Sequence, residues 1–191
     1  MRLYITGNIG VGKSTLAQYI ANKYNYIHYP EFNSYDIGDK LLHKRLTGMM
    51  DIPTFQIEVM NIYSTHRKYD DDHNYVIERL ASEGYNIFTD DVDRDYVYGM
   101  YKLFHIDEPH NLLVYHLDIT HGLDSIKDEV DYIIRNQVSD LCIYLYTDIN
   151  TLMHRIRTRA RPGEDKYDVK YIQKIQDRYD QIYRSVNESQ M

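Results

Sequence analysis

Residues 2–15 read RLYITGNIGVGKST. The opening residues, up to Thr6, form a short apolar run that favours a buried strand, and a glycine-rich turn follows it directly. Residues 7–14 match the pattern G-x-x-x-x-G-K-[ST], in which glycines let successive backbone N–H groups turn inward around phosphate oxygens. The helix predicted from Lys13 would point its N-terminus at the same anion. The pattern predicts that Lys13 lies at the β- and γ-phosphates of a nucleotide and that the Ser14 hydroxyl binds Mg²⁺.

Strands and helices alternate along the rest of the chain. Beyond the first strand, we expect strands at residues 26–29, 74–77 and 141–146, and helices at residues 13–24, 36–46, 53–66, 91–104, 124–137, 150–160 and 169–182. Such alternation is typical of parallel βαβ units, so the predicted fold class is α/β. Residues 113–119 alternate in hydrophobicity like a strand, but Pro109 and Gly122 flank them like a loop. We therefore interpret residues 105–122 as an insertion.

Composition and charge narrow the class of protein. The length of 191 residues suits one domain, residues 1–191. The net charge of −7 makes nucleic-acid polymers poor partners, because their affinity comes from Lys and Arg neutralising phosphates. No apolar run approaches the roughly 20 residues of a membrane span, and the start of the chain leaves no room for a signal peptide. The lone cysteine, Cys142, cannot form an internal disulfide, which predicts a reducing, cytoplasmic location.

Two acidic residues come at the ends of predicted strands. Glu31 follows the second strand, and Glu78 ends the third. Ligands of an open α/β sheet bind outside the carboxyl ends of its strands, where a carboxylate can orient an attacking hydroxyl and accept its proton. The alternatives are that Glu31 is a solvated loop acid and that Glu78 forms a structural ion pair with Arg79.

Arginines are concentrated in one later segment, at Arg155, Arg157, Arg159 and Arg161. In a helix, the first and third of these share one face, and the second and fourth share another. Guanidinium groups are suited to hold a transferring phosphoryl group, and Pro162-Gly163 would let the following chain move as a lid. The alternative is a solvated basic helix face.

Signatures of two other classes of phosphate-loop protein are absent. A GTPase would read guanine with an N-K-x-D sequence, but Asn22-Lys23 is followed by Tyr24-Asn25. A motor-type ATPase would have an apolar strand that ends in Asp or Asp-Glu, but the closest run ends in Glu78-Arg79.

Taken together, these segments resemble the deoxynucleoside kinase family, which includes thymidine, deoxycytidine and deoxyguanosine kinases. The matching segments, in family order, are residues 7–15, Pro30-Glu31, Phe55-Gln56, Ile77-Glu78-Arg79, residues 140–147 and residues 155–161. The resemblance covers most of the chain. It implies a three-layer P-loop kinase fold, in which helices flank a parallel sheet of four or five strands, with an arginine-rich lid at about residues 155–167. It also implies transfer of the γ-phosphate of ATP to the 5′-hydroxyl of a deoxynucleoside, with a role in nucleotide salvage.

The resemblance further implies roles for individual residues. Glu31 would be the general base at the 5′-hydroxyl, and Arg79 would hold that hydroxyl or its phosphate. Glu78 would join Ser14 at Mg²⁺. The ATP site would comprise Gly7, Asn8, Ile9, Gly10, Val11, Gly12, Lys13, Ser14, Thr15 and Arg155. The acceptor site would comprise Glu31, Phe55, Gln56, Tyr63, Arg79, Gly84 and Glu164, with Gln56 paired to the base and Glu164 at the sugar 3′-hydroxyl. The catalytic set would comprise Glu31, Arg79, Lys13, Arg155, Arg159 and Arg161.

Several positions depart from the family pattern. Leu80 stands where the family has serine after Glu-Arg. Arg45 and Leu46 stand near the place of a tyrosine that contacts the 3′-hydroxyl. Tyr63 and Gly84 replace a charged pair that deoxycytidine and purine kinases use, which favours thymidine or another pyrimidine as the acceptor.

The end of the chain departs as well. The family has a fifth strand after its last helix, and a loop there covers adenine. Residues 184–191 are all that remains after the last predicted helix, and they are too polar for such a strand. We therefore expect either a four-stranded sheet or a shortened chain, and in both cases a less enclosed adenine site.

Two other functions stay open. A nucleoside monophosphate kinase of thymidylate kinase type would share the fold and the lid, and Arg45 is a candidate for binding its acceptor's phosphate. A non-catalytic nucleotide-binding protein is favoured by the departures and opposed by the intact Lys13, Ser14, Glu31 and Arg79. Members of the family commonly pair through helices, so the resemblance implies a homodimer.

Overall fold

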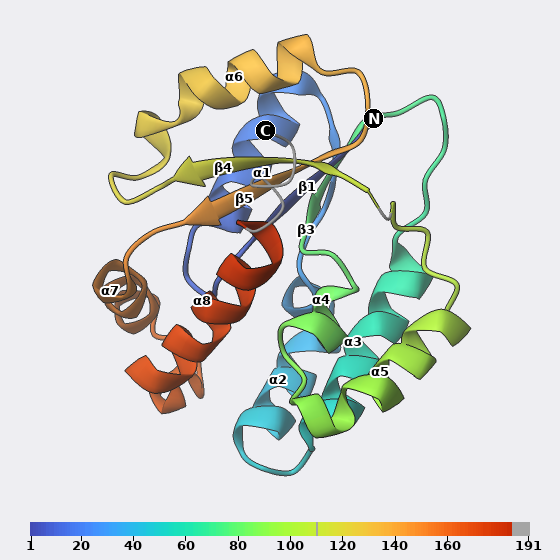
Figure 1. The fold of residues 1–191 in the computed structure, drawn as a ribbon, viewed down its shortest axis with the longest axis vertical. Helices are drawn as coiled ribbons and strands as arrows, with labels where there is room; N and C mark the ends of the chain where they lie inside the picture. The colour runs from blue at the N-terminus through green and yellow to red at the C-terminus, as the bar shows by residue number, and fades with distance from the viewer. Residues whose placement is uncertain (110, 185–191) are drawn as a thin grey trace.

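The computed structural model describes residues 1–109 and 111–184. Within them, five parallel strands form one sheet in the order β2-β3-β1-β5-β4 (Figure 1). The strands are β1 (Arg2–Gly7), β2 (Ile27–Tyr29), β3 (Tyr75–Glu78), β4 (Leu113–Asp118) and β5 (Leu141–Tyr146). The α/β fold class and the parallel sheet predicted from the sequence are confirmed, and the sheet has five strands rather than four.

Strand β4 corrects the interpretation of residues 105–122 as an insertion. It pairs in parallel with β5 along its whole length, from Leu113 opposite Leu141 to Asp118 opposite Tyr146. The alternation in hydrophobicity was a true strand signal, and Pro109 and Gly122 lie outside the paired residues. In the described residues, the fifth strand therefore comes before β5 in the chain. Of the C-terminal residues 184–191, only Arg184 lies inside the described part of the chain.

Helices connect the strands and cover both faces of the sheet. They are α1 (Lys13–Tyr24), α2 (Gly38–Leu46), α3 (Ile52–His66), α4 (Glu83–Asn86), α5 (Asp91–Leu103), α6 (Lys127–Asn136), α7 (Ile149–Arg159) and α8 (Val169–Tyr183), with short 3-10 turns η1 (Phe32–Ser34), η2 (Leu123–Ser125) and η3 (Glu164–Lys166). Aspartates cap three of these helices, because Asp51, Asp148 and Asp168 each accept a hydrogen bond from a backbone N–H in the first turn.

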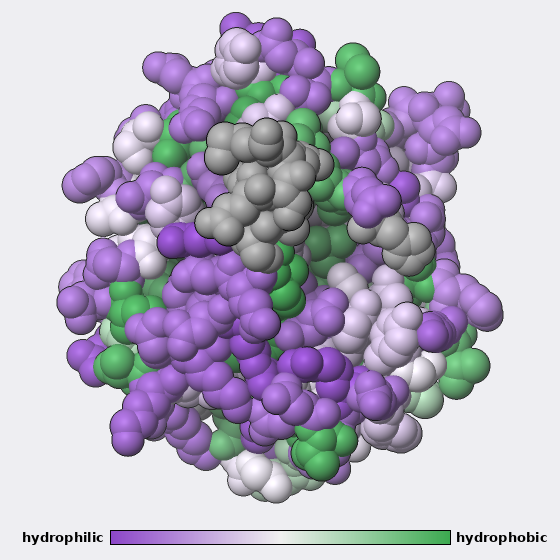
Figure 2. All heavy atoms as spheres, in the orientation of Figure 1, coloured by the Kyte–Doolittle hydropathy of each residue, from purple (hydrophilic) through white to green (hydrophobic). Residues whose placement is uncertain are grey.

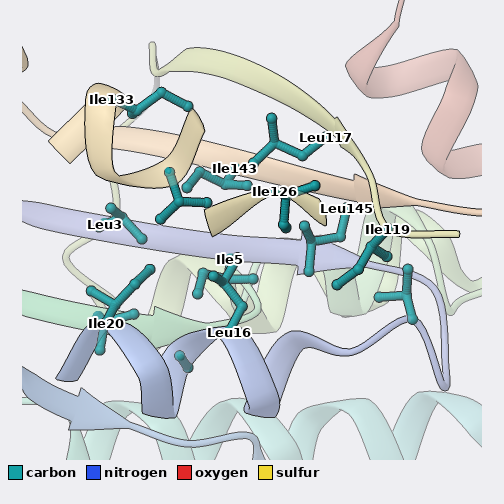
Figure 3. Close-up of a cluster of buried hydrophobic side chains, with 14 of the residues drawn as sticks. Leu3, Ile5, Leu16, Ile20, Leu117, Ile119, Ile126, Ile133, Ile143 and Leu145 are labelled. Carbon is teal, nitrogen blue, oxygen red and sulfur yellow. The ribbon is translucent and has the colours of Figure 1, made fainter. Parts of the chain in front are cut away.

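Alternating side chains of the central strands build two cores, one on each face of the sheet. Leu3 and Ile5 of β1 and Ile143 of β5 face α1 and α6 (Figure 3). Tyr4 and Tyr144, which point the other way, pack with α8. A third cluster joins η1, α2 and α3, and Phe32 and Phe55 meet there edge to face.

The outer surface is mostly hydrophilic on the side shown in Figure 2. Along residues 1–109 and 111–184, none of the helices has the length and hydrophobicity that a bilayer-spanning helix needs.

Parallel strands bring their carboxyl ends to one edge of the sheet, and this edge positions the site. β1 ends at Gly7, and the neighbouring β3 ends at Glu78, which pairs with Ile5 of β1. Glu31 comes two residues after the end of β2. The glycine-rich loop and the two predicted acids are thereby brought together by topology alone.

Candidate active site

The glycine-rich loop between β1 and α1 has the backbone of a phosphate-binding loop. Gly7 and Gly12 have φ values of 137° and 116°, which side chains rarely tolerate, and a Cβ on Gly7 would lie 2.3 Å from the Leu145 carbonyl oxygen. Lys13 is buried, and its Nζ donates to the carbonyl oxygens of Gly7 at 3.2 Å and Asn8 at 3.1 Å. The lysine ammonium therefore lies directly over the loop in which the sequence predicts phosphates.

Glu31 faces this loop. Its Oε2 lies 3.8 Å from Lys13 Nζ, and its Oε1 accepts a hydrogen bond from Arg79 Nε at 2.7 Å. The Glu31 carboxylate, the Lys13 ammonium and the Arg79 guanidinium therefore lie together, at the place where the sequence predicts the acceptor hydroxyl and the transferring phosphate. The solvated loop acid, the alternative considered for Glu31, does not fit this placement.

The charges of Glu31, Lys13 and Arg79 shift the pKa values of the neighbouring groups. Burial alone would raise the pKa of the Glu31 carboxyl, but the positive charges of Arg79 and Lys13 outweigh it and lower that pKa to about 2. Burial, together with the nearby charge of Arg79, lowers the pKa of Lys13 to about 8. At neutral pH, Glu31 is therefore fully ionised, and Lys13 is mostly protonated but close to its titration range.

Arg79 is held in an unusual backbone conformation. Its φ of 67° lies in the left-handed region, which a non-glycine residue adopts only when its surroundings enforce it. Arg67, buried behind it, donates to the carbonyl oxygens of Arg79 at 2.8 Å and Glu78 at 2.7 Å. Glu83 accepts from Arg79 Nη1 at 3.0 Å, and Tyr179 also bonds that atom. These contacts aim the Arg79 guanidinium into the site.

Sequence reasoning missed Arg67 and Glu83. Arg67 directly follows α3 and reads as a solvated residue at a helix end, and Glu83 reads as an ordinary first-turn acid of α4. The signal that could have found them is that Arg67 precedes and Glu83 follows Glu78-Arg79 in the chain. Their contacts with Arg79, however, form only in the folded structure.

Ser14 and Glu78 fit the predicted Mg²⁺ site. The Ser14 hydroxyl donates to Glu78 Oε2 at 2.6 Å, and Glu78 Oε1 is 2.8 Å from His28 Nε2. In the described residues, 1–109 and 111–184, no group of three or more His, Cys, Asp and Glu side chains is placed to hold a metal. One hydroxyl and one carboxylate suit Mg²⁺, which keeps several waters and binds the phosphates of its substrate. The structural ion pair of Glu78 with Arg79 is not formed, because Arg79 turns to Glu31 and Glu83.

A cavity of about 760 Å³ extends over the loop and contains most of the predicted residues. Its walls include all six residues of the catalytic set, residues 9–15 of the ATP site, and Phe55, Gln56 and Glu164 of the acceptor site. The basic residues in the walls are Lys13, Arg45, Arg79, Arg155, Arg159, Arg161 and Lys166, and the acidic ones are Glu31, Glu164 and Asp168. This excess of positive charge in a chain of net charge −7 suits a ligand with several phosphates.

Five predicted site residues lie outside the walls of the cavity. Gly7 and Asn8 form the base of the phosphate loop, and Glu78 is buried beneath Ser14. Tyr63 is buried under η1, where its hydroxyl accepts from the Phe32 N–H at 3.3 Å. Gly84 does not line the cavity but packs against Gln56, which does, since a Cβ on Gly84 would lie 3.2 Å from Gln56 Oε1. Neither Tyr63 nor Gly84 is therefore placed to touch a ligand in the cavity.

The arginine segment differs from a continuous helix. Helix α7 ends at Arg159, and Ala160 takes a left-handed conformation with φ 49°. This bend turns Arg161 back into the cavity wall, whereas Arg157 lies outside it. The prediction that Arg157 and Arg161 share a face is therefore wrong.

The ends of the lid are tied to other parts of the site. Arg159 pairs with the buried Glu164, at 2.5 Å from Nη2 to Oε1 and 3.1 Å from Nε to Oε2. The Glu164 carboxylate predicted to receive a sugar hydroxyl is thus bound to Arg159 in this structure. Lys166 Nζ donates to the Leu46 carbonyl oxygen, which holds the lid against the end of α2.

Comparison with known proteins decides the family. The sequence model described as deoxynucleoside kinase matches residues 3–191. The chain belongs to the deoxynucleoside kinase family. The resemblance found in the sequence is confirmed, and the protein is an ATP-dependent kinase.

Individual relatives of this kinase are distant. Deoxyguanosine kinase of Bacillus subtilis (strain 168) is 25% identical over 189 residues, which cover 97% of this chain and 79% of that protein. The structure of deoxyadenosine kinase from M. mycoides with bound dATP has a TM-score of 0.61 and 20% identity, and the match covers 99% of this chain and 86% of that one. The structure of the same enzyme with dCMP and dCDP has a TM-score of 0.62 and 19% identity over 97% and 84% of the two chains. These structures support the P-loop kinase fold.

Proposed function

We propose that this kinase transfers the γ-phosphate of ATP to the 5′-hydroxyl of a deoxynucleoside. The observation that carries the proposal is the position of Glu31. Its carboxylate lies 3.8 Å from the phosphate-loop lysine and 2.7 Å from Arg79, at the wall of a cavity that also contains Phe55 and Gln56. An acceptor hydroxyl hydrogen-bonded to Glu31 would therefore face the terminal phosphate held over Lys13.

The positions of these groups in the cavity support a role for each of them. Phosphoryl transfer passes through a loose transition state, so catalysis rests on positioning and on stabilising charge. A carboxyl with a pKa of about 2 is a weak base, and Glu31 accordingly orients the hydroxyl and takes its proton late. Lys13 and Arg79 neutralise the moving phosphoryl group, and Arg161 reaches the same cavity from the lid.

Mg²⁺ would be held by the Ser14 hydroxyl and the Glu78 carboxylate, which already share a hydrogen bond of 2.6 Å. When bound, the ion would neutralise the β- and γ-phosphates. His28, on the other oxygen of Glu78, would keep that carboxylate oriented.

The preferred base stays a prediction. The prediction of a pyrimidine rested on Tyr63 and Gly84, neither of which lines the cavity, and the relatives named above are a deoxyguanosine kinase and a deoxyadenosine kinase. Gln56 lies in the cavity wall and supports pairing with a base of either kind, since its amide both donates and accepts. Arg45 also lies in the wall, which keeps a nucleoside monophosphate as the second candidate acceptor.

The experiment that tests the proposal is an acceptor panel. The purified chain is incubated with ATP and Mg²⁺ and with each of the four deoxynucleosides or their monophosphates, and ADP release is measured. We expect turnover with at least one deoxynucleoside and little with the monophosphates. Turnover restricted to the monophosphates would replace the proposal with the thymidylate kinase type of reaction. Binding of ATP without any turnover would support a non-catalytic nucleotide-binding protein.

We also propose that the enzyme acts in the cytoplasm, in salvage of DNA precursors, and that it forms a homodimer. Support for the dimer comes from α5, which exposes Val92, Tyr96 and Leu103 along one side, at 89%, 61% and 68% of their surfaces. Light scattering coupled to size-exclusion chromatography tests it, and a mass of 22.9 kDa at all concentrations would contradict it. The cytoplasmic location rests on the free, buried thiol of Cys142.

A further inference from the structure

A second buried carboxylate holds Arg79 from outside the cavity. Glu83, at the start of α4, is only 2% exposed and does not line the cavity wall, whereas Arg79 does. The Glu83 carboxylate accepts four hydrogen bonds, which come from Arg79 Nη1 at 3.0 Å, the Tyr179 hydroxyl at 2.5 Å, the Tyr183 hydroxyl at 3.2 Å and the Thr6 hydroxyl. Its acceptor sites are therefore filled from within the protein.

Tyr179 connects this carboxylate to the last helix. It lies on α8, which covers one face of the sheet (Figure 1), and it is fully buried. Its hydroxyl accepts a hydrogen bond from Arg79 Nη1 and donates one to Glu83, so the three polar groups form a closed triangle. The Arg79 guanidinium also lies over the ring of Phe88, 4.5 Å from its centroid. The Nη1 end of Arg79 is therefore held independently of Glu31, which bonds Nε.

We propose that Glu83 and Tyr179 anchor Arg79 throughout phosphoryl transfer, and that Tyr179 is a positioning residue of the reaction. The proposal rests on the proposed function, because it requires Glu31 to take a proton from the acceptor. Tyr179 lies outside the cavity wall and would act on the reaction only through Arg79.

Glu31 by itself could not hold Arg79 through the reaction. The proton of the 5′-hydroxyl moves to Glu31 while the hydroxyl oxygen bonds to the γ-phosphorus of ATP, and the bond from that phosphorus to the bridging oxygen breaks, with ADP as the leaving group. The protonated Glu31 has lost its charge, and a neutral hydrogen bond is roughly half as strong as a charge-assisted one. Glu83 takes no part in the proton transfer, so it keeps Arg79 directed at the phosphoryl group as charge develops there.

Tyr144 provides a matched control for Tyr179. It is also fully buried in the same core, and its ring stacks on that of Tyr179 with the centroids 5.8 Å apart. Its hydroxyl donates to Asp180 at 2.8 Å and accepts from Gln176 at 2.7 Å. Among the residues that the structure describes, it has no hydrogen bond to Arg79. Removing this hydroxyl therefore removes buried hydrogen bonds without loosening Arg79.

The kinetic test uses an acceptor found in the panel. Tyr179→Phe should lower kcat by about tenfold and leave KM for ATP within about twofold, because it loosens Arg79 and not the phosphate loop. Tyr144→Phe should change kcat by less than about twofold. In an Arg79→Lys background, which lacks Nη1, Tyr179→Phe should also change kcat by less than about twofold, since the hydroxyl acts through Arg79.

A second measurement needs no acceptor. Exchange of the Arg79 Nε–H with solvent is followed by NMR, and the signal is assigned by its absence from Arg79→Lys. We expect Tyr179→Phe to speed this exchange by about tenfold, because the guanidinium opens more often when it loses a partner. Tyr144→Phe should leave the exchange rate within about twofold.

Equal losses of kcat from Tyr179→Phe in the wild-type and Arg79→Lys backgrounds, or an unchanged kcat or exchange rate, would overturn the proposal. If Tyr179→Phe does not fold, Glu83→Gln takes its place with the same expected results. A wild type without turnover in the acceptor panel, but with exchange that Tyr179→Phe accelerates, would refute the proposed function alone. Turnover in the panel, with neither effect in Tyr179→Phe, would refute only this assignment.

Discussion

At the scale of single residues, Glu31 carries the proposed chemistry. Replacing it by glutamine keeps the size of the side chain and one acceptor oxygen but removes its charge and its ability to accept a proton. We expect Glu31→Gln to lower kcat by about 100-fold or more, while the nucleoside still binds through Phe55 and Gln56. Steady-state kinetics and equilibrium binding of the nucleoside check this. An unchanged kcat would remove Glu31 from the mechanism.

Lys13 gives the nucleotide site a pH dependence at the same scale. Burial and Arg79 lower its pKa to about 8, so the ligand-free enzyme loses this positive charge as the pH rises through that value. Affinity for ADP should therefore be level below pH 8 and fall by up to about tenfold per pH unit above it, because phosphates attract the protonated form. The ADP phosphates themselves have finished titrating by then. Calorimetric titrations between pH 6.5 and 9.5 measure this.

Lys13→Arg is the control for that profile, since an arginine stays protonated throughout the range. The substitution should bind ADP more weakly but with no fall above pH 8. A falling profile in Lys13→Arg would show that another group titrates.

At the scale of elements, the turn between β3 and α4 depends on Arg67. Replacing it by methionine would leave the buried carbonyl groups of Glu78 and Arg79 without donors, each of which costs about 1–3 kcal/mol. We expect Arg67→Met to lower the free energy of unfolding by about 3 kcal/mol and to lower kcat, because Arg79 loses its enforced conformation. Urea denaturation and kinetics measure the two effects. The neighbouring exposed Lys68 serves as control, and Lys68→Met should change stability by less than about 0.5 kcal/mol.

The packing of α4 against α3 supplies a second prediction at this scale. A Cβ on Gly84 would lie 2.8 Å from Met60 Cε and 3.2 Å from Gln56 Oε1, so Gly84→Ala must displace one or both side chains. Displacing Gln56 should raise KM for the nucleoside by about fivefold, or about 1 kcal/mol, and leave KM for ATP unchanged. Gly99→Ala on α5 is the control, because nothing lies within 4 Å of its hypothetical Cβ. Equal changes in both KM values would place Gly84 outside nucleoside binding.

At the scale of the whole molecule, the ion pairs of Glu31 with Lys13 and Arg79 make the free energy of unfolding depend on pH in the acid range. The pKa of this carboxyl falls from 4.5 to about 2 on folding, so its contribution to stability is complete above pH 4.5 and is lost as the pH falls toward 2. The size of that contribution is about 3 kcal/mol. Glu31→Gln should therefore remove about this much of the acid-induced decrease in the free energy of unfolding. Urea denaturation at a series of pH values compares the two proteins, and parallel pH profiles would contradict the prediction.

Local signals in the sequence determined the phosphate loop, the parallel α/β fold and the family. The glycines and Lys13 must lie at fixed spacings to surround a phosphate, and Glu31 and Glu78 follow strands whose ends meet at one edge of any parallel sheet. These are properties of short segments and of their order, so the sequence alone contains them.

Only the tertiary structure decided which distant residues support that site. Residues 113–118 are the edge strand because they pair with β5. The nearby Pro109 made the same residues resemble a loop in the sequence. Arg67 reaches the backbone of Arg79, and Arg155 joins Val11 to Ile119, through contacts between segments that no local pattern connects. The bend that returns Arg161 to the cavity likewise depends on the left-handed backbone conformation of Ala160, which the sequence pattern does not indicate. Such contacts depend on how the packed elements meet in space, and a one-dimensional pattern carries no information on that.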